Sequence, residues 1–252
     1  MLLQRRHYLL TASLVIAALL LSWCKAGAQA RQVWRITSLE WEPYASSRMN
    51  NGGNAIQSLR NVLRQCNIEL QVEFYPWRRA QEIARSSDYL GYFPAWPEEV
   101  RSGFVQSDPV TSSNLAVMGL SDSEVAPDAL PQLFERYRVG VVNSYTYPAN
   151  VHALMQQYAA NTDSGATSDL SLLKMLVAKR FDLAITDPTV LQYLADKEGA
   201  GELKIIKLLP DLPLVIALRS APDNQPRIEL IKRLLHGKMS GEPVSQRDCV
   251  VQ

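Results

Sequence analysis

The stretch "LLKMLVAKRFDLAITDPTVLQYL", residues 172–194, decides the fold class because it places a short apolar strand between two helical patterns. Ser168 is the expected N-cap of the first of these helices. The run "FDLAIT", residues 181–186, is typical of a buried strand, and Asp187 with Pro188 starts the next helix. This helix–strand–helix order predicts crossover connections in an α/β fold.

The same alternation extends in both directions from this stretch. We expect further strands over residues 33–39, 70–76, 88–93, 137–142, 203–209 and 212–218. We expect further helices over residues 54–66, 77–87, 131–136, 148–160 and 225–237. Asn54 is the expected N-cap of the first helix, Gly237 the expected end of the last, and the polar segment 161–167 is expected to be a break between helices. This order predicts two α/β units with mainly parallel sheets.

The chain is expected to cross twice between the two units, near residues 111–119 and 208–218. Residues 31–113 and 213–252 would then form a discontinuous first lobe, and residues 114–212 the second lobe. Two crossing strands suit a hinge, and the cleft between such lobes is a usual place for a small-molecule site. We therefore predict an α/β, two-lobed fold with a two-strand hinge and a ligand cleft between the lobes.

The chain opens with the order of a secretory signal peptide. Two arginines precede an apolar run over residues 9–23, and small residues follow. The apolar run is short for a membrane span, and cleavage fits after Ala28 or after Ala30, so residues 1–30 are the expected leader. We therefore expect a protein exported to the periplasm of a Gram-negative bacterium.

Removal of this leader takes away three basic and no acidic residues, which leaves 23 basic and 25 acidic residues. A near-neutral balance argues against nucleic acid as a partner, because phosphate binding needs a basic surface. His152 and His236 are the histidines that remain, and the sequence has no HExxH or CxxC pattern. We therefore expect no metal site and no cofactor.

Two cysteines remain after the leader, Cys66 and Cys249. In an exported protein they have one possible pairing, a disulfide bond. The alternative is a buried thiol at the end of the first helix and an unpaired thiol near the C-terminus.

Five stretches fall where the strands of an open α/β sheet end, which is where such sheets place their ligand groups. They are residues 38–47, "YPWRRA" over 75–80, "YFPAWPEEVR" over 92–101, "VVNSYTYP" over 141–148 and "ITDP" over 185–188. Each has a simpler explanation: Trp41 and Trp77 could be core packing, Asp187 could serve only as a helix cap, and Arg101 could be a surface charge. A shared cleft would favour the functional interpretation.

Five features of the chain carry a family resemblance: the motifs "WEPY" and "PWRRA", Arg101 followed by "SDP", the motif "GVVNSYTY" and the stretch 172–194. In their order and spacing they resemble periplasmic solute-binding proteins of polar amino-acid ABC transporters. The resemblance covers about residues 34–236. It implies a periplasmic-binding-protein-like fold of type II, whose two α/β lobes close like a Venus flytrap over a small molecule.

The resemblance also implies roles for individual residues. Trp41 and Trp77 would clamp the ligand side chain, and Arg101 would pair with the ligand carboxylate, a task that suits the planar guanidinium. Asp187 would receive the ligand ammonium. The other ligand-binding residues expected from the motifs are Tyr44, Ser144, Thr146 and Tyr147.

The chain departs from the family pattern after its third expected strand. Amino-acid binders usually carry small hydroxyl residues there, whereas this chain has Tyr92, Phe93, Pro94, Ala95 and Trp96. We therefore expect Tyr92, Phe93 and Trp96 to form an aromatic pocket floor. Such a floor admits aromatic, peptide-like or other carboxylate ligands besides free amino acids.

Three functions follow from these observations. The preferred hypothesis is a monomer that binds a small polar or carboxylate-bearing, amino-acid-like solute and delivers it to the membrane permease of an ABC transporter. The first alternative is a sensor input that presents its ligand to a membrane receptor. The second is an enzyme resembling cyclohexadienyl dehydratase, which needs a cleft acid with a raised pKa. Glu42, Glu98 and Glu99 are its candidates, and each is expected to be solvated.

Overall fold

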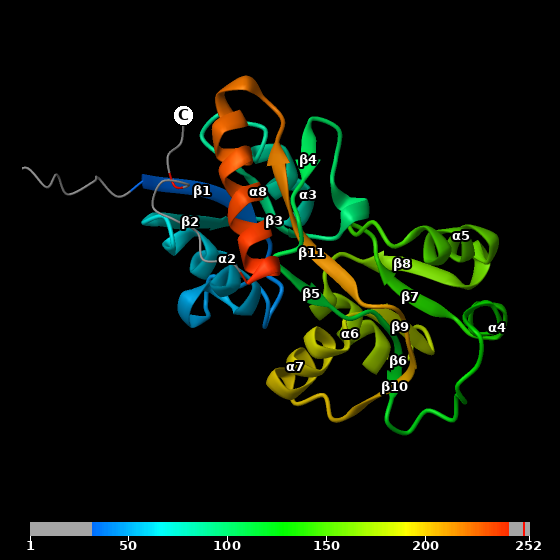
Figure 1. The fold of residues 1–252 in the computed structure, drawn as a ribbon. Helices are drawn as coiled ribbons and strands as arrows, with labels where there is room; N and C mark the ends of the chain where they lie inside the picture. Colours follow the sequence, from blue (N-terminus) through cyan, green and yellow to red (C-terminus); the bar gives the residue numbers. More distant parts are fainter. Residues whose placement is uncertain (1–31, 242–248, 250–252) are drawn as a thin grey trace, which may run out of the picture. The chain divides into compact units, whose positions relative to one another are not determined.

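Two β-sheets organise the chain in the computed structural model, which describes residues 32–241 and Cys249 (Figure 1). Both sheets belong to one compact unit that begins at Val33. The expected leader, residues 1–30, lies outside the described residues. No helix among the described residues has the length and apolar character that crossing a membrane requires.

The first sheet has the strand order β2-β1-β3-β11-β4, with β5 also paired to β11. Its strands are β1 (Gln32–Ser38), β2 (Ile68–Phe74), β3 (Gly91–Ala95), β4 (Phe104–Gln106), β5 (Thr111–Ser113) and β11 (Leu212–Arg219). Its helices are α2 (Asn54–Arg64), α3 (Trp77–Ile83) and α8 (Gln225–Ser240), and we call this set of elements the first lobe. Ile56, Leu59 and Leu63, which recur at helical spacing in the sequence, are fully buried along one face of α2.

The second sheet has the strand order β10-β6-β9-β7-β8. Its strands are β6 (Ala116–Leu120), β7 (Val139–Val142), β8 (Thr162–Ala166), β9 (Leu183–Thr186) and β10 (Leu203–Leu208). Its helices are α4 (Leu130–Arg136), α5 (Ala149–Gln157), α6 (Asp169–Val177) and α7 (Pro188–Glu198), and we call this set the second lobe. The two-lobed α/β fold predicted from the sequence is confirmed.

Two neighbouring segments connect the sheets, as a two-strand hinge requires. The chain leaves β5 at Ser113 and enters β6 at Ala116, and it returns from Leu208 of β10 to Leu212 of β11. Ser113 pairs with Leu212 on one side and Ala116 with Leu208 on the other. These returning strands run antiparallel to their neighbours, so both sheets are mixed and the prediction of mainly parallel sheets was wrong.

Several helix boundaries differ from those expected. The residue before α2 is Gly53 with φ 100°, so Asn54 is the first helical residue and not the cap. Helix α8 continues through Gly237 and ends at Gly241, whose φ of 73° suits glycine. The polar segment 161–167 contains β8, an edge strand in which Ser164 is exposed and Thr162 and Asp163 are partly buried. Ser168 does cap α6 through its side chain, as predicted.

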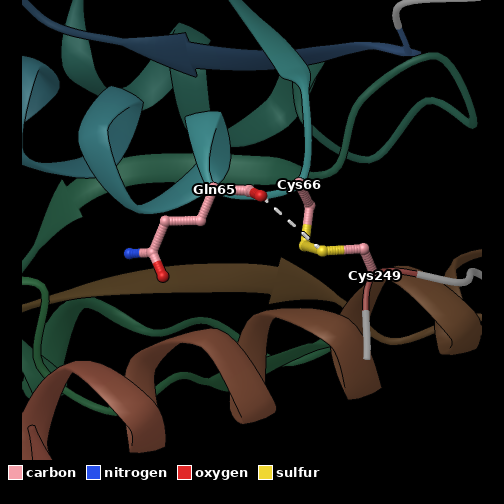
Figure 2. The surroundings of a disulfide bond; sticks show 3 residues. All are labelled: Gln65, Cys66 and Cys249. Carbon is pink, nitrogen blue, oxygen red and sulfur yellow. Dashed lines mark hydrogen bonds between the residues drawn. A yellow bond between two sulfur atoms is a disulfide. The ribbon is translucent and has the colours of Figure 1, made fainter. Parts of the chain in front are cut away.

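A disulfide bond joins Cys66, which follows α2, to Cys249 beyond α8 (Figure 2). The two Cα atoms lie 5.1 Å apart, although 183 positions separate the residues in sequence. The bond ties the end of the chain to the first lobe, and the whole second lobe lies within the loop that it closes.

Candidate functional site

An aromatic cavity lies where the ends of first-lobe strands meet the second lobe. We call it the aromatic box; it is lined by Leu39, Trp41, Trp77, Pro94, Trp96, Glu99, Tyr145 and Leu214. All of these residues except Tyr145 belong to the first lobe. The cavity has a volume of about 10 Å³, which is room for about one water molecule.

The aromatic rings of the box meet nearly at right angles. Trp41 and Trp96 have ring centroids 6.1 Å apart at an interplanar angle of 82°, and Trp96 and Tyr145 are 5.8 Å apart at 77°. Tyr44 stacks on Trp41 with centroids 4.6 Å apart. Edge-to-face packing of this kind fixes the orientation of each ring. The sequence stretches around Trp41, Trp77 and Trp96 therefore do converge on one site.

Glu99 has the only carboxyl group among the lining residues of the box. Its side chain is 5% exposed and accepts hydrogen bonds from Trp77 Nε1 at 2.8 Å, from the Trp96 backbone N at 3.3 Å and from the Thr146 backbone N at 3.4 Å. Burial raises the pKa of Glu99 to about 7, and this effect outweighs the three donors and the distant charge of Arg101, which act in the opposite direction.

The expectation that all three candidate acids are solvated was wrong for two of them. Glu99 folds back over its own 3-10 turn, Pro97–Glu99, and enters the box. Glu42 is 8% exposed, since it accepts hydrogen bonds from Ser46 and from Lys197 of the second lobe at 2.7 Å. Glu98 is exposed, as expected.

Arg101 lies outside the box and bridges the two lobes. Its Nη2 donates to the Thr146 hydroxyl at 3.1 Å, and its backbone N donates to the Tyr92 hydroxyl at 2.9 Å. The guanidinium is exposed and so remains open to further acceptors. The structure thus brings together Arg101 and Thr146, which the sequence assigned to opposite sides of the cleft.

A larger groove of about 530 Å³ adjoins the box and shares Leu39, Trp77 and Tyr145 with it. We call it the interlobe groove; its other lining residues are Glu40, Phe74, Tyr75, Pro76, Arg78, Asn143, Ser144, Thr167 and Ser168. Arg78 donates across the groove to the backbone oxygen of Asn143 at 3.0 Å. Its volume lies within the range of small-molecule sites.

Three of the predicted aromatic residues lie in the protein core. Tyr92 and Phe93 are fully buried, and the Tyr92 hydroxyl donates to the backbone oxygen of Glu99 at 2.7 Å. The Tyr147 hydroxyl accepts from Val142 N and donates to Ile185 O. Of the segment expected to form the pocket floor, Pro94 and Trp96 line the box.

Asp187 is 1% exposed and caps α7, with Oδ1 accepting from Thr189 N at 2.7 Å and Val190 N at 3.1 Å. Its Oδ2 accepts from Asn114 N in the hinge at 3.0 Å. Burial raises the pKa of Asp187, and burial also raises the pKa of the neighbouring Tyr44 to about 12. The predicted cap is confirmed, and each carboxylate oxygen already has a backbone donor.

Tyr145 is an aromatic residue of the site that sequence reasoning did not single out, although it lies within the motif "NSYTYP". Its hydroxyl donates to Asp169, which also accepts from Thr186 Oγ1 at 2.9 Å, and these bonds fix the ring against the first lobe. The spacing of apolar residues in helices and strands does not predict a contact of this kind between the two lobes. No cluster of potential metal ligands occurs among residues 32–241 and Cys249.

Comparisons with known proteins identify the fold but no relative by sequence. No protein-family model matches the chain, and no curated protein matches it in sequence. Among solved structures, a periplasmic binding protein of an arginine transport system from Legionella pneumophila has a TM-score of 0.64 at 18% identity, over 83% of this chain and 95% of its own. The chain has the type II fold of periplasmic solute-binding proteins.

Two further structures show the range of proteins that share this fold. A histidine kinase sensor domain with similarity to periplasmic binding proteins has a TM-score of 0.68 at 14% identity, over 86% of this chain and 95% of its own. An ancestral amino-acid-binding protein, a precursor of cyclohexadienyl dehydratase, has a TM-score of 0.62 at 14% identity, over 84% of this chain and 92% of its own. At these identities the likeness concerns the fold alone.

Proposed function

We propose that this chain binds a small polar or carboxylate-bearing, amino-acid-like solute between its lobes. The observation that carries the proposal is the interlobe groove, which is lined by aromatic, hydroxyl and charged side chains of both lobes. A ligand held there contacts both lobes and so favours their closure. The protein acts as a periplasmic monomer and delivers the solute to the membrane permease of an ABC transporter.

Arg101 is the proposed carboxylate anchor, with Thr146 and Ser144 as hydroxyl donors beside it. The exposed guanidinium offers N–H donors besides the one that bonds Thr146. Trp41 and Trp77 provide ring surfaces for the rest of the ligand, and Asp187 is the proposed partner of a ligand ammonium. We place the leader before residue 31 and the lobe boundaries near residues 113 and 213.

Isothermal titration calorimetry of the mature protein against a panel of amino acids and carboxylates tests this proposal. We expect at least one panel member to bind and Arg101→Ala to weaken that binding by ten-fold or more. Arg180→Ala is the matched control, because Arg180 is also exposed but, unlike Arg101, donates no side-chain hydrogen bond across the cleft among the described residues. Unchanged affinity in Arg101→Ala contradicts the anchor, and no binding by any compound contradicts the function.

A sensor role is the alternative, since a histidine kinase sensor domain shares this fold. Genes next to the coding sequence distinguish the two roles: a permease gene favours transport and a sensor kinase gene favours sensing. A dehydratase-like activity is the lesser alternative, and the burial of Glu99 in a cleft is the observation in its favour. An ultraviolet assay with prephenate tests it, because turnover would form an aromatic product.

A further inference from the structure

The aromatic box surrounds a buried carboxyl group, that of Glu99, which forms no ion pair among the described residues, although the charge of Arg101 acts on it from outside the box. The three hydrogen-bond donors of Glu99 are an indole and two backbone amides. Burial of an unpaired carboxylate is unfavourable, and an adjacent cation removes most of that cost.

The walls of the box have the chemistry that attracts organic cations. Trp41, Trp77, Trp96 and Tyr145 line it, and the faces of such rings carry negative electrostatic potential. An ionised carboxylate has about four acceptor positions, and the three donors of Glu99 leave one free. Indole and phenol rings around a carboxylate therefore favour a monovalent cation over an anion or a neutral group.

Trp41, another lining residue of the box, carries a buried polar group without a partner in the described part of the chain. It is 6% exposed, and its indole N–H has no hydrogen-bond partner among the described residues. Buried donors in folded proteins are nearly always paired, so this N–H is available to an acceptor atom of a ligand or to a water molecule. A ligand that carries an acceptor atom as well as a cation would satisfy both Trp41 and Glu99.

The route into the box runs through the interlobe groove. Tyr145 lines both spaces and is the one wall residue of the box that the second lobe supplies. Separation of the lobes would withdraw Tyr145 together with the Thr146 N–H that bonds Glu99, and would join the box to the groove. A cation larger than a water molecule could then enter, and Tyr145 would close against it in a wider arrangement than the described one, in which the box has room for about one water molecule.

We propose that Glu99 and the surrounding rings form a subsite for an organic monocation, the positively charged end of the solute. This inference rests on the proposed function and adds the class of ligand: a compound with an ammonium or guanidinium group. The cationic group contacts Trp41, Trp96 and Tyr145, and Glu99 neutralises its charge. The remainder of the ligand lies in the interlobe groove.

Isothermal titration calorimetry with matched probes that carry or lack a cationic group tests the subsite. 4-Guanidinobutanoate is compared with 4-ureidobutanoate, its analogue without a cationic group, and choline with 3,3-dimethylbutan-1-ol, its neutral carbon analogue; succinate represents ligands without a cation. We expect one cation to bind at least ten-fold more tightly than its analogue without the cationic group. A response in the first pair identifies an N–H cation, and a response in the second identifies a quaternary ammonium.

Glu99→Gln provides the second arm, with Glu98→Gln as its matched control. Glu98 is the adjacent exposed glutamate, so its variant makes the same change in net charge outside the box. We expect Glu99→Gln to weaken binding of the cation at least ten-fold and Glu98→Gln to leave it within two-fold. The analogue comparison uses the unaltered protein and decides the question even if Glu99→Gln does not fold.

Three results overturn the subsite and can be told apart. Equal binding of a cation and its analogue without the cationic group, or binding of succinate alone, contradicts the subsite and leaves the proposed solute-binding function intact. Absence of binding by every probe contradicts the subsite, and the panel of amino acids and carboxylates then decides the proposed function separately. Cation binding that persists unchanged in a folded Glu99→Gln variant also overturns the role of Glu99.

Discussion

At the scale of single residues, Glu98 and Glu99 show how one step along the chain changes the chemistry of a side chain. Both belong to the turn Pro97–Glu99, yet Glu98 faces solvent and Glu99 is enclosed by indole rings. The difference arises because Glu99 accepts a hydrogen bond from the Trp96 backbone, which directs its side chain back over the turn. The burial of Glu99 has a measurable consequence for the dependence of stability on pH.

We expect the free energy of unfolding to fall as the pH rises from about 4.5 to about 7. The ordinary pKa of the Glu99 carboxyl group is 4.5, and burial raises it to about 7 in the folded protein. Within this window the folded protein holds a proton that the unfolded chain has released, so rising pH favours unfolding, by up to about 3 kcal/mol. Urea unfolding between pH 4 and 8 measures the effect.

Glu99→Gln removes this contribution, whereas Glu98→Gln is expected to retain it. The comparison separates Glu99 from the ionisable groups that face it, which are Arg101, Tyr92, Tyr145 and Tyr147. Equal slopes for Glu99→Gln and the unaltered protein would show that the carboxyl group ionises normally.

Trp77→Phe is expected to raise the pKa of Glu99 further. The substitution keeps an aromatic ring but removes the Nε1–H that donates to Glu99 Oε1 at 2.8 Å, and this bond stabilises the ionised carboxylate. The pH range over which stability declines should therefore move upward. Urea unfolding of the variant across the same pH series checks it, and a range that moves downward would contradict the assigned hydrogen bond.

At the scale of elements, local signals predicted the helices well and the contacts between elements poorly. The stripe of Ile56, Leu59 and Leu63 and the caps Ser168 and Asp187 depend on residues within one helix or its first turn, so spacing alone reveals them. Strand β8 is polar because it lies at a sheet edge, and its pattern has no apolar alternation.

The aromatic box was not predicted from the sequence, for a related reason. The sequence indicated Trp41, Trp77 and Trp96, since each follows a strand, but the approach of Tyr145 depends on how the second lobe meets the first. The burial of Glu99 likewise depends on rings that are distant in sequence. Of the predicted site residues, Tyr92, Phe93 and Tyr147 lie in the core. The presence of an aromatic residue in the sequence does not indicate whether its side chain points into the core or into the site.

Asp187 caps the start of α7 and accepts a hydrogen bond from Asn114 in the hinge. Two substitutions distinguish these two roles. Asp187→Ala should lower the free energy of unfolding by about 1–2 kcal/mol, because α7 loses its cap and Asn114 N loses an acceptor. Asp187→Asn should cost less, since asparagine also caps helices, although its amide N–H₂ would face Asn114 N–H. Urea unfolding gives both values; an equal loss in the two variants would contradict the capping role.

At the scale of the whole molecule, polar contacts join the lobes on several sides of the cleft. Lys197 donates to Glu42, Arg101 to Thr146 and Arg78 to the backbone of Asn143. The lysine and arginine side chains are partly or fully exposed, so each contact contributes little and competes with water. Weak contacts of this kind allow the lobes to separate, as ligand entry into the box requires.

The double substitution Cys66→Ser with Cys249→Ser should lower the free energy of unfolding by about 2–4 kcal/mol. The disulfide closes a loop with a sequence separation of 183, and its loss gives the unfolded chain more conformations. Urea unfolding measures the change. The unaltered protein under reducing conditions is the control and should match the variant; equal stability of oxidised and reduced protein would contradict the effect.

The same bond determines how the molecule would carry a mechanical load. A pulling force applied at the two ends passes from the amino-terminal segment to Cys66, across the two sulfur atoms and out beyond Cys249. The chain between the cysteines, which includes the second lobe and the ligand cleft, bears no tension while the bond is intact. Oxidised molecules should therefore extend only by the residues outside the loop, and chemical reduction should add the contour length of the loop in a single-molecule trace.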